Sequence, residues 1–310
     1  GRLYPDITIE QKHALTYCDP ANPNGVAKAT IDGEILGYTF DWYVGSVTGS
    51  PFYNGSEVQG LTAITYSVAA TDVITGCIST ESIVIDNDPV QVPAPSVIIL
   101  SHRTNCVTPD GALSVSVNGN TQDYIFDWYD GNAVKAQNDN LGEFYRDLVE
   151  GPYTTTATDV ESGCVSNPVV TTILPFMEIP EFKIETVPTN CEADVGEASL
   201  IMLNDVQVRE VAYDINGTIL IGDFQTQLPK GRFTVVVTSV NECRNSAEFE
   251  ILPEILVFNG VSQNGDGQND IFEISCIEDF PQNTVKIFNR AGTLVYEGKG
   301  YNNAEVSFNG

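Results

Sequence analysis

Long hydrophobic runs are missing from this 310-residue chain, since no apolar stretch approaches the roughly 18 to 20 residues that a membrane-spanning helix needs. Basic residues are also scarce: 14 Lys and Arg stand against 42 Asp and Glu, which gives a net charge of -28. Such a surface repels phosphate backbones and anionic lipid headgroups. The composition therefore disfavours nucleic acid as a partner.

Catalytic and zinc-binding patterns are lacking too. Neither a Gly-x-Ser-x-Gly nor a His-Glu-x-x-His arrangement occurs, and no Cys-x-x-Cys pair is present. The two histidines, His13 and His102, precede Cys18 and Cys106 at similar places in a repeat, which is typical of strand residues and not of a general base. We predict that the chain is not an enzyme.

What the sequence does contain is a repeat of about 85 residues. The segment Phe40-Asp41-Trp42-Tyr43 recurs as Phe126-Asp127-Trp128-Tyr129, and a more divergent third copy carries Tyr213-Asp214-Ile215, with Ile215 aligned to the tryptophans. The repeat predicts three modules, at residues 1–90, 91–178 and 179–253, followed by a different module at 254–310. Short proline-bearing junctions predict a stiff, elongated row.

Within each module, apolar and polar residues alternate with a period of two, as in Ala112-Leu113-Ser114-Val115-Ser116-Val117. Turn signals such as Asn118-Gly119 and Asn216-Gly217 separate these stretches. The pattern predicts an all-β protein made of tandem immunoglobulin-like or fibronectin-III-like sandwiches. Strand order does not follow from this pattern.

Seven cysteines accompany the repeat, two in each copy and one beyond it. Because the pair recurs once per module, we predict intramodule disulfides Cys18–Cys77, Cys106–Cys164 and Cys191–Cys243. Such bonds indicate an oxidising, extracytoplasmic compartment. The seventh, Cys276, shares a strand face with Phe272 and Ile274 and is predicted to be a buried small hydrophobe without a partner, with an intermolecular disulfide as the alternative.

Trp42 and Trp128 are aromatic residues of the kind that stack on sugar rings, but core packing explains them better. Phe40 and Trp42 lie two residues apart and so share one strand face, and an aliphatic residue at the third position would keep apolar burial while losing a stacking platform. Tyr43 and Tyr129 point to the other face and are the candidate contacts for surface glycans.

The segment Asn264-Gly265-Asp266-Gly267-Gln268-Asn269-Asp270 is the most informative part of the last module. A loop so rich in Asn, Asp and Gly folds into a tight structural turn, which is the interpretation that the sequence favours. The alternative is a calcium site, with oxygen ligands from Asn264, Asp266 and Asp270 and the Gln268 carbonyl. The EF-hand template is not satisfied.

The last module resembles the gliding-motility-associated C-terminal domain, the type B sorting signal of type IX secretion in Bacteroidota. The residues that carry the resemblance are Val257-Phe258-Asn259, Asn264-Gly265-Asp266-Gly267-Gln268-Asn269-Asp270, Phe288-Asn289-Arg290, Gly292 and Gly300-Tyr301-Asn302-Asn303. Among the sorting-motif residues we count Asn264, Gly265, Asp266, Gly267, Asn269, Asp270, Phe288, Asn289, Arg290 and Gly292.

The chain departs from that family in several places. Gln263 and Ala291 stand where the family usually has Pro and Trp, and the family continues for about one more hairpin. We therefore expect an incomplete sorting domain whose missing hairpin leaves a sheet edge that a partner strand could complete. The first residues contain neither an initiator Met nor a signal peptide, so we also expect an interior piece of a longer precursor.

The upstream copies are similar to the repeats of long gliding adhesins, with Gly151-Pro152-Tyr153-Thr154 and Thr158-Asp159-Val160-Glu161-Ser162-Gly163-Cys164 as the best matches. The two resemblances imply the stalk and anchor of a secreted cell-surface adhesin, linked to gliding motility or attachment. They further imply the type IX translocon and an outer-membrane β-barrel of the type B substrate family as partners, at the outer-membrane surface. A non-catalytic tail of a secreted hydrolase and a surface filament subunit remain the alternatives.

Overall fold

The structure is a computed structural model that describes residues 6–191, 193–258, 260–262 and 264–310. Among these residues every regular element is a β-strand, apart from the short 3-10 helix η1 (Ile277–Asp279), and no helix is long and apolar enough to cross a membrane. Two residues of the sorting-domain comparison, Asn259 and Gln263, lie outside the described part of the chain.

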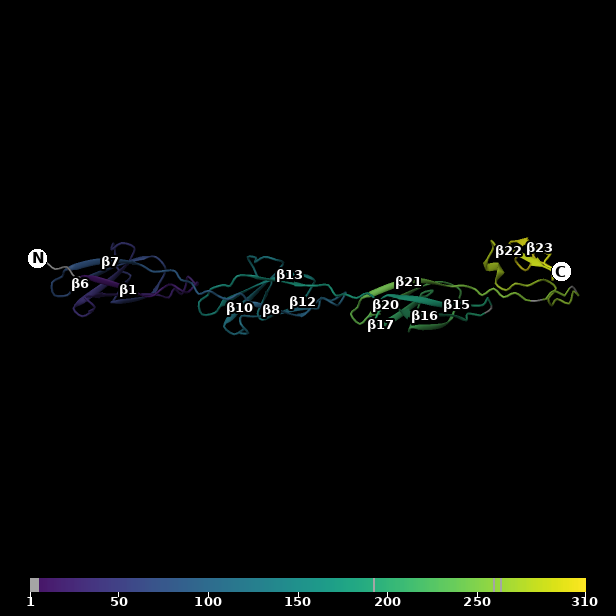
Figure 1. Ribbon diagram of the computed structural model, residues 1–310, viewed down its shortest axis with the longest axis horizontal. Coiled ribbons are helices and arrows are strands. Elements are labelled where there is room, and N and C mark those ends of the chain that lie inside the picture. Colours follow the sequence, from purple (N-terminus) through teal and green to yellow (C-terminus); the bar gives the residue numbers. More distant parts are fainter. Residues whose placement is uncertain (1–5, 192, 259, 263) are drawn as a thin grey trace. The chain divides into compact units, whose positions relative to one another are not determined.

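The first sandwich pairs its strands into two antiparallel sheets (Figure 1). One sheet has the order β1 (Ile7–His13), β2 (Gly25–Ile31), β5 (Glu57–Leu61). The other has the order β4 (Tyr53–Asn54), β3 (Tyr38–Val44), β6 (Thr65–Asp72), β7 (Ile78–Val84). Buried residues from both sheets, among them Ala27, Trp42 and Val68, form one core.

The second and third sandwiches repeat this strand order. In the second, the sheets are β8 (Ser96–Ser101), β9 (Gly111–Ser116), β12 (Phe144–Leu148) and β11 (Asn140–Leu141), β10 (Tyr124–Asp130), β13 (Gly151–Asp159), β14 (Val169–Ile173). In the third, they are β15 (Phe182–Val187), β16 (Gly196–Met202), β19 (Phe224–Leu228) and β18 (Thr218–Ile221), β17 (Val208–Ile215), β20 (Gly231–Ser239), β21 (Arg244–Ile251). Seven strands in two antiparallel sheets confirm tandem immunoglobulin-like sandwiches.

A tyrosine at the start of the sixth strand supports the same assignment. The Tyr153 hydroxyl donates to the Val149 carbonyl at 2.9 Å, and the Tyr66 hydroxyl accepts the Thr62 backbone N–H at 3.1 Å. Each phenol thus bonds backwards to the chain four residues upstream, as in the tyrosine corner of immunoglobulin-like domains. The third sandwich has Phe233 here, which keeps the burial and loses the hydrogen bond.

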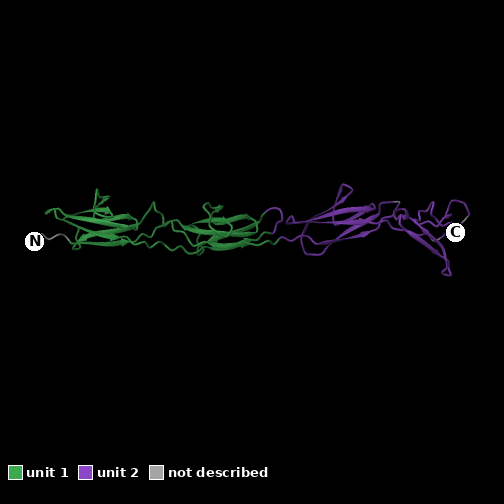
Figure 2. Ribbon diagram, turned by 90° about the horizontal axis from the view of Figure 1, so that it is seen from above, with its two compact units in different colours: residues 1–103, 109–176 green, residues 104–108, 177–310 purple. Residues whose placement is uncertain are grey.

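The residues after Glu254 contain one hairpin, β22 (Thr284–Phe288) and β23 (Leu294–Lys299), with η1 before it. Its core holds Ile274, Ile277 and Tyr301. The chain divides into two compact units (Figure 2): residues 1–103 and 109–176 form the first, while Thr104–Thr108 and Met177–Gly310 form the second. The short segment Thr104–Thr108 lies between β8 and β9 of the second sandwich in sequence, yet it belongs to the unit that holds the third.

The alignment of the third copy needs a correction. The N–H groups of Gly55, Gly142 and Gly222 donate to the carbonyls of Phe40, Phe126 and Val211 at 2.9, 2.9 and 3.0 Å. These bonds make the three acceptor residues equivalent, and two residues later the third sandwich has Tyr213, not Ile215, in the tryptophan position. Because strand faces repeat every two residues, the shift by two leaves the predicted buried face unchanged.

Candidate functional site

The disulfides of this protein join neighbouring modules. We call the loop between the first two strands of a sandwich the A–B loop, and the turn between its last two strands (residues 73–77, 160–164 and 240–243) the F–G turn. Within the first unit, Cys18 of the first A–B loop bonds Cys164 of the second F–G turn, with 4.8 Å between the Cα atoms. Backbone bonds reinforce this junction, since Ser162 O accepts the Cys18 N–H at 2.7 Å.

A side-chain contact adds to the first junction. The Tyr17 hydroxyl donates to Glu161 Oε1 at 2.9 Å. The hydrogen bond to the Glu161 carboxylate raises the pKa of Tyr17 above its ordinary value, because the neutral phenol is the form that donates. Gly163 lies so close to Asp19 that a Cβ there would meet the Asp19 Cβ at 3.0 Å, so the two segments are in close contact.

The second junction has the same construction, and both partners belong to the second unit. Cys106 of the segment Thr104–Thr108 bonds Cys243 of the third F–G turn, with 5.0 Å between the Cα atoms. Asn241 O accepts the Cys106 N–H at 3.0 Å, as Ser162 O accepts the Cys18 N–H at the first junction. In both cases the acceptor lies two residues before the F–G cysteine.

The third junction, also in the second unit, connects the last sandwich to the terminal domain. Cys191 of the third A–B loop bonds Cys276, with 5.5 Å between the Cα atoms. Cys276 is 4% exposed and directly precedes η1. Asp279, three residues after Cys276 and at the end of η1, forms an ion pair with Lys230 of the third sandwich, whose Nζ is 2.6 Å from a carboxylate oxygen.

The predicted intramodule pairing is therefore wrong, and so is the expectation that Cys276 has no partner, although its burial is confirmed. The physical reason is strand length. Cys77 directly precedes β7, whereas the A–B loop reaches the other end of β7 through the bridge Leu15↔Asn87. Seven residues at about 3.3 Å each separate the two ends, far beyond the roughly 7 Å that a disulfide spans. Cys77 is the free cysteine of the described residues.

The equivalent bridges in the other sandwiches make the same argument. Arg103↔Pro175 and Thr189↔Pro253 place the second and third A–B loops beside the far ends of β14 and β21. Cys164 and Cys243 stand before the near ends of those strands. In each sandwich the two cysteines consequently lie at opposite ends, where they can only reach a neighbouring module.

The terminal loop at residues 264–270 folds onto its own carboxylates. Asp270 accepts the N–H groups of Gly265 and Gly267 at 3.0 and 2.8 Å, and Asp266 accepts the Gln268 N–H at 2.8 Å. The Gln268 bond, followed by one from the Asn264 side chain, lowers the pKa of Asp266. These contacts support the tight turn that the sequence favours, while the calcium ligands Asn264, Asp266 and Asp270 stay a prediction.

In the described part of the chain, one cluster of three potential metal-ligating side chains occurs. Sulfur and carboxylate atoms of Cys191, Cys276 and Asp279 lie within 4.8 Å of one another. Because the two sulfurs are bonded to each other, they do not offer the thiolates that a soft metal requires. The group is therefore the third disulfide junction and not a metal centre.

The remaining sorting-motif residues have structural places in the hairpin. Phe288 ends β22, and the Asn289 side-chain oxygen accepts the N–H groups of Ala291 and Thr293, both at 3.0 Å. Gly292 supports this turn with a φ of 79°, a left-handed conformation that favours glycine. Arg290 is exposed.

Two asparagines hold the core of the terminal domain together. The Asn283 side chain donates to Tyr301 O and accepts the Tyr301 N–H, both at 2.8 Å, and Asn303 makes the corresponding pair with Ile274 at 2.7 and 2.9 Å. Asn283 was missed by the sequence reasoning because a single Asn in a loop carries no pattern. Asn303 belongs to the quoted motif, and its role is to fix backbone.

The aromatic residues of the sandwiches occupy the places that core packing predicted. Trp42 and Trp128 are fully buried, and their indole N–H groups donate to Gly55 O and Gly142 O, both at 2.9 Å. Tyr129 is only 8% exposed, so it does not offer the open ring that glycan stacking requires. Tyr43 is half-buried.

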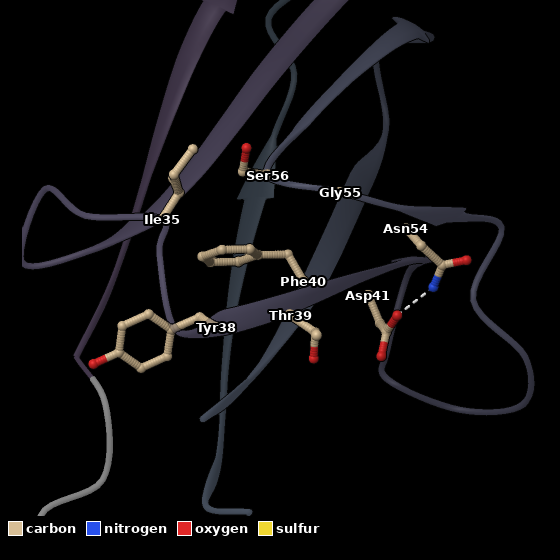
Figure 3. A pocket seen from close by; sticks show the side chains of 8 residues that line it. All are labelled: Ile35, Tyr38, Thr39, Phe40, Asp41, Asn54, Gly55 and Ser56. Carbon is tan, nitrogen blue, oxygen red and sulfur yellow. Dashed lines mark hydrogen bonds between the residues drawn. The ribbon is translucent and has the colours of Figure 1, made fainter. Parts of the chain in front are cut away.

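The first sandwich has a recess on its surface (Figure 3). Its lining residues are Ile35, Tyr38, Thr39, Phe40, Asp41, Asn54, Gly55 and Ser56. Asp41 accepts a hydrogen bond from the Asn54 side chain, and the Phe40 ring belongs to the core. This lining contains neither a nucleophile with an adjacent base nor a set of metal ligands, so the recess carries no assigned chemistry.

Several solved structures of multi-domain chains are similar to this chain at low sequence identity. The three N-terminal domains of the Hoc outer capsid protein of bacteriophage RB49 match with 12% identity over 81% of this chain and 99% of that one, at a TM-score of 0.27. Titin domains I67–I69 match with 11% identity over 81% and 94%, at 0.30. At such scores the fold assignment rests on the strand pairing itself. A search of curated proteins found no match.

The terminal residues give a specific match. Residues 255–310 are matched by the model of the CHU_C type IX secretion signal domain, which confirms the resemblance seen in the sequence. This segment contains the carboxylate-capped loop, the β22–β23 hairpin and Cys276, whose disulfide links it to the third sandwich. The chain is accordingly a secreted protein of immunoglobulin-like sandwiches whose residues 255–310 form a type IX secretion signal domain, and that signal implies an interaction with the type IX translocon.

Proposed function

We propose that this chain is the stalk and the anchoring region of a secreted adhesin at the outer-membrane surface, serving gliding motility or attachment, and that it is not catalytic. The observation that carries the proposal is the series of disulfides that connects each sandwich to the next and the last sandwich to the sorting domain. In a protein that transmits pulling force, such crosslinks limit how far the modules unravel, an advantage that a soluble enzyme tail does not need.

The route that tension would follow is short. From the N-terminus it runs to Cys18, crosses to Cys164, continues to Cys191, and crosses to Cys276. This route contains about 80 residues, which extend to roughly 280 Å, whereas the whole unfolded chain would reach about 1,100 Å. The disulfides therefore limit how far the protein stretches.

The strands on this route are all at sheet edges. It passes through β1, β14 and β15, each of which is the outermost strand of its sheet, and then through both strands of the two-stranded sheet β22–β23. The strands that carry Trp42, Trp128 and Tyr213 in the cores of the sandwiches lie off the route. Tension would peel edge strands first and would leave most of each core unloaded.

Single-molecule pulling on the full chain tests this mechanical role. In the oxidised protein, we expect the end-to-end length to stop near 280 Å, and after reduction we expect it to rise toward 1,100 Å. A variant with Cys18→Ser, Cys106→Ser and Cys191→Ser, which removes all three disulfides, should behave as the reduced protein does. Equal lengths before and after reduction would contradict the proposal.

The attachment role is tested on cells that display the protein. The variant with Cys18→Ser, Cys106→Ser and Cys191→Ser should reach the surface in the normal amount, because residues 255–310 are intact, but cells carrying it should detach at lower shear. Deletion of residues 255–310 should abolish surface display instead. If cells lacking the whole protein attach as well as cells that have it, the adhesin proposal fails.

The anchor is proposed to dock on an outer-membrane β-barrel of the type B substrate family. The hairpin β22–β23 supports this, since a two-stranded sheet exposes backbone groups on both of its edges that a partner strand can pair with. Crosslinking from an exposed residue such as Arg290, followed by identification of the attached membrane protein, tests the docking. Recovery of the translocon alone would argue against a separate barrel partner.

A further inference from the structure

The F–G turn of the first sandwich has the same internal geometry as that of the second. Asp72 N–H donates to Cys77 O at 3.0 Å, and Asp159 N–H donates to Cys164 O at 2.9 Å. The cysteine N–H donates to Thr75 Oγ1 in the first turn and to Ser162 Oγ in the second, both at 3.3 Å. Cys77 is therefore the counterpart of Cys164.

The third F–G turn, one residue shorter, completes the comparison. Ser239 N–H donates to Cys243 O at 2.8 Å, and the residue before the cysteine has a left-handed φ of 61° at Glu242, as it has 67° at Gly76 and 68° at Gly163. Two of the three equivalent cysteines are thus seen bonded, each to the A–B-loop cysteine of the preceding sandwich.

The three F–G turns differ in how far their cysteines are exposed to solvent. Cys164 is 1% exposed and Cys243 is fully buried, because an A–B loop lies on each, whereas Cys77 is half-buried. Ser162 is buried and its carbonyl accepts two backbone N–H groups, while Thr75 is exposed and no donor reaches its carbonyl within the described residues. The first turn thus has the hydrogen bonds of the other two turns, but no A–B loop lies on it in the described part of the chain.

Apolar side chains surround the uncovered turn. Ile74 is 91% exposed and Leu36, on the adjacent loop, is 83% exposed; Val73 N–H donates to Gly37 O at 3.0 Å and holds that loop beside the turn. Ile74 stands where the second sandwich has Glu161, the acceptor of the Tyr17 hydroxyl. An A–B loop that covers the first turn therefore meets an apolar side chain at this point, and the tyrosine hydrogen bond of the second turn has no acceptor there.

We propose that Cys77 is the attachment point for a further sandwich of this repeat type, whose A–B-loop cysteine forms a disulfide with it. The bonded A–B and F–G cysteines are 146 and 137 residues apart, so a partner at similar spacing falls ahead of residue 1. The other six cysteines are already paired with one another. The inference rests on the pairing rule and not on the adhesin function.

The reaction is a thiol–disulfide exchange. Both thiols lose a proton, a sulfur–sulfur bond forms between them, and the two electrons reduce one disulfide of an oxidant to two thiols. In the test the oxidant is glutathione disulfide. The Cys77 backbone need not move, because the occupied turns hold their cysteines in the same hydrogen bonds.

The experiment extends the full chain with a second copy of its own first module. A copy of residues 1–90 carrying Cys77→Ser is placed ahead of residue 1, and the protein is refolded in a glutathione redox buffer. The unextended protein should show one alkylatable thiol after denaturation, and the extended protein should show none. A non-reducing peptide map should link the Cys77 peptide to a Cys18 peptide within a monomer.

A matched control has the same extension with both Cys18→Ser and Cys77→Ser in the copy, and here Cys77 should remain alkylatable. In that control, alkylation of native Cys77 should still be slower than in the unextended protein if the added module covers the turn. The fluorescence of its buried tryptophan reports whether the copy folds. A folded copy beside a fully reactive Cys77, or a Cys77 linked to any other peptide or to a second molecule, would overturn the proposal.

Discussion

The sandwiches and the terminal domain of this protein are held together in different ways. The core of the first sandwich contains eleven buried residues, including Trp42, whereas that of the terminal domain contains three among the described residues. The terminal domain compensates with the side-chain clamps of Asn283 and Asn303 and with a disulfide to its neighbour. The stability of the sorting signal therefore depends in part on its connection to the third sandwich, whereas the stability of each sandwich comes chiefly from its own core.

The largest effect should come from the core of a sandwich. Trp128→Ala removes a fully buried indole and its hydrogen bond to Gly142 O, which should cost about 3–5 kcal/mol of the free energy of unfolding of the second sandwich. Urea denaturation can be monitored by the fluorescence of Trp42, which reports the first sandwich, and by amide exchange in each sandwich. We expect the second sandwich alone to unfold at a lower urea concentration. Val134→Ala, at an exposed residue of the same sandwich, is the control and should change little.

Loss of the third disulfide should weaken the terminal domain. Cys276→Ser frees a connection of about 20 residues between the folded third sandwich and Cys276, and closure of such a loop is worth about 3 kcal/mol. Hydrogen exchange around Tyr301 should accelerate strongly, while the amides of β20 should be unaffected. Equal acceleration in both places would mean that the domain and the sandwich unfold together.

Alkaline pH should destabilise the third sandwich through the tyrosine at the centre of its core. Burial, with a further contribution from the Asp223 charge, raises the pKa of Tyr213 to about 12, whereas the equivalent Trp42 and Trp128 do not ionise. The pKa of Tyr213 is higher in the folded state than in the unfolded state, so the neutral phenol stabilises the fold fully below about pH 10. Between pH 10 and pH 12 the free energy of unfolding should fall by about 1.4 kcal/mol per pH unit. Urea midpoints at pH 9 and 11 should differ less for Tyr213→Phe; an unchanged difference would assign the loss to other phenols.

Calcium should have a smaller effect, confined to the terminal domain. A site with a dissociation constant near that of extracellular calcium modules would add about 1 kcal/mol at millimolar calcium. The gain is limited because the metal must displace the N–H groups that Asp266 and Asp270 already accept. Thermal unfolding with calcium and with a chelator tests this, with Asp266→Asn as the control. Identical melting temperatures would reject the site.

The exposed ion pair between Lys230 and Asp279 should matter least. Their side chains are 51% and 30% exposed, so water and salt screen the attraction. Lys230→Ala should lower the stability of the terminal domain by no more than about 0.5 kcal/mol, and the difference should vanish in 1 M salt. A larger loss that persists at high salt would indicate that the lysine stem contributes by packing.

The sequence was sufficient for the fold and for the terminal motif. Alternation with a period of two placed Trp42 and Trp128 in the core, and it tolerated an alignment error between Ile215 and Tyr213 because both lie on the same face. The sorting domain was recognisable because several motifs occur together in one short segment.

The disulfide pairing was beyond the sequence pattern. A repeat identifies equivalent cysteines in each copy. It does not show how they pair, because pairing within a module and pairing with the next module both give one disulfide per copy. The distinction is three-dimensional, since Cys18 lies at one end of β7 and Cys77 at the other. The useful signal was Cys276. If each cysteine pairs with a neighbouring module, the seventh cysteine gains a partner and Cys77 is the one that stays free.

The overlap of the three disulfide-closed loops has a consequence for survival outside the cell. The loops run from residue 18 to 164, from 106 to 243 and from 191 to 276, so together they enclose every peptide bond between Cys18 and Cys276. A protease that hydrolyses any single bond in this span leaves two fragments that are still joined through sulfur. Within this span, only paired cleavages, or cleavage combined with a reductant, can release the outer modules.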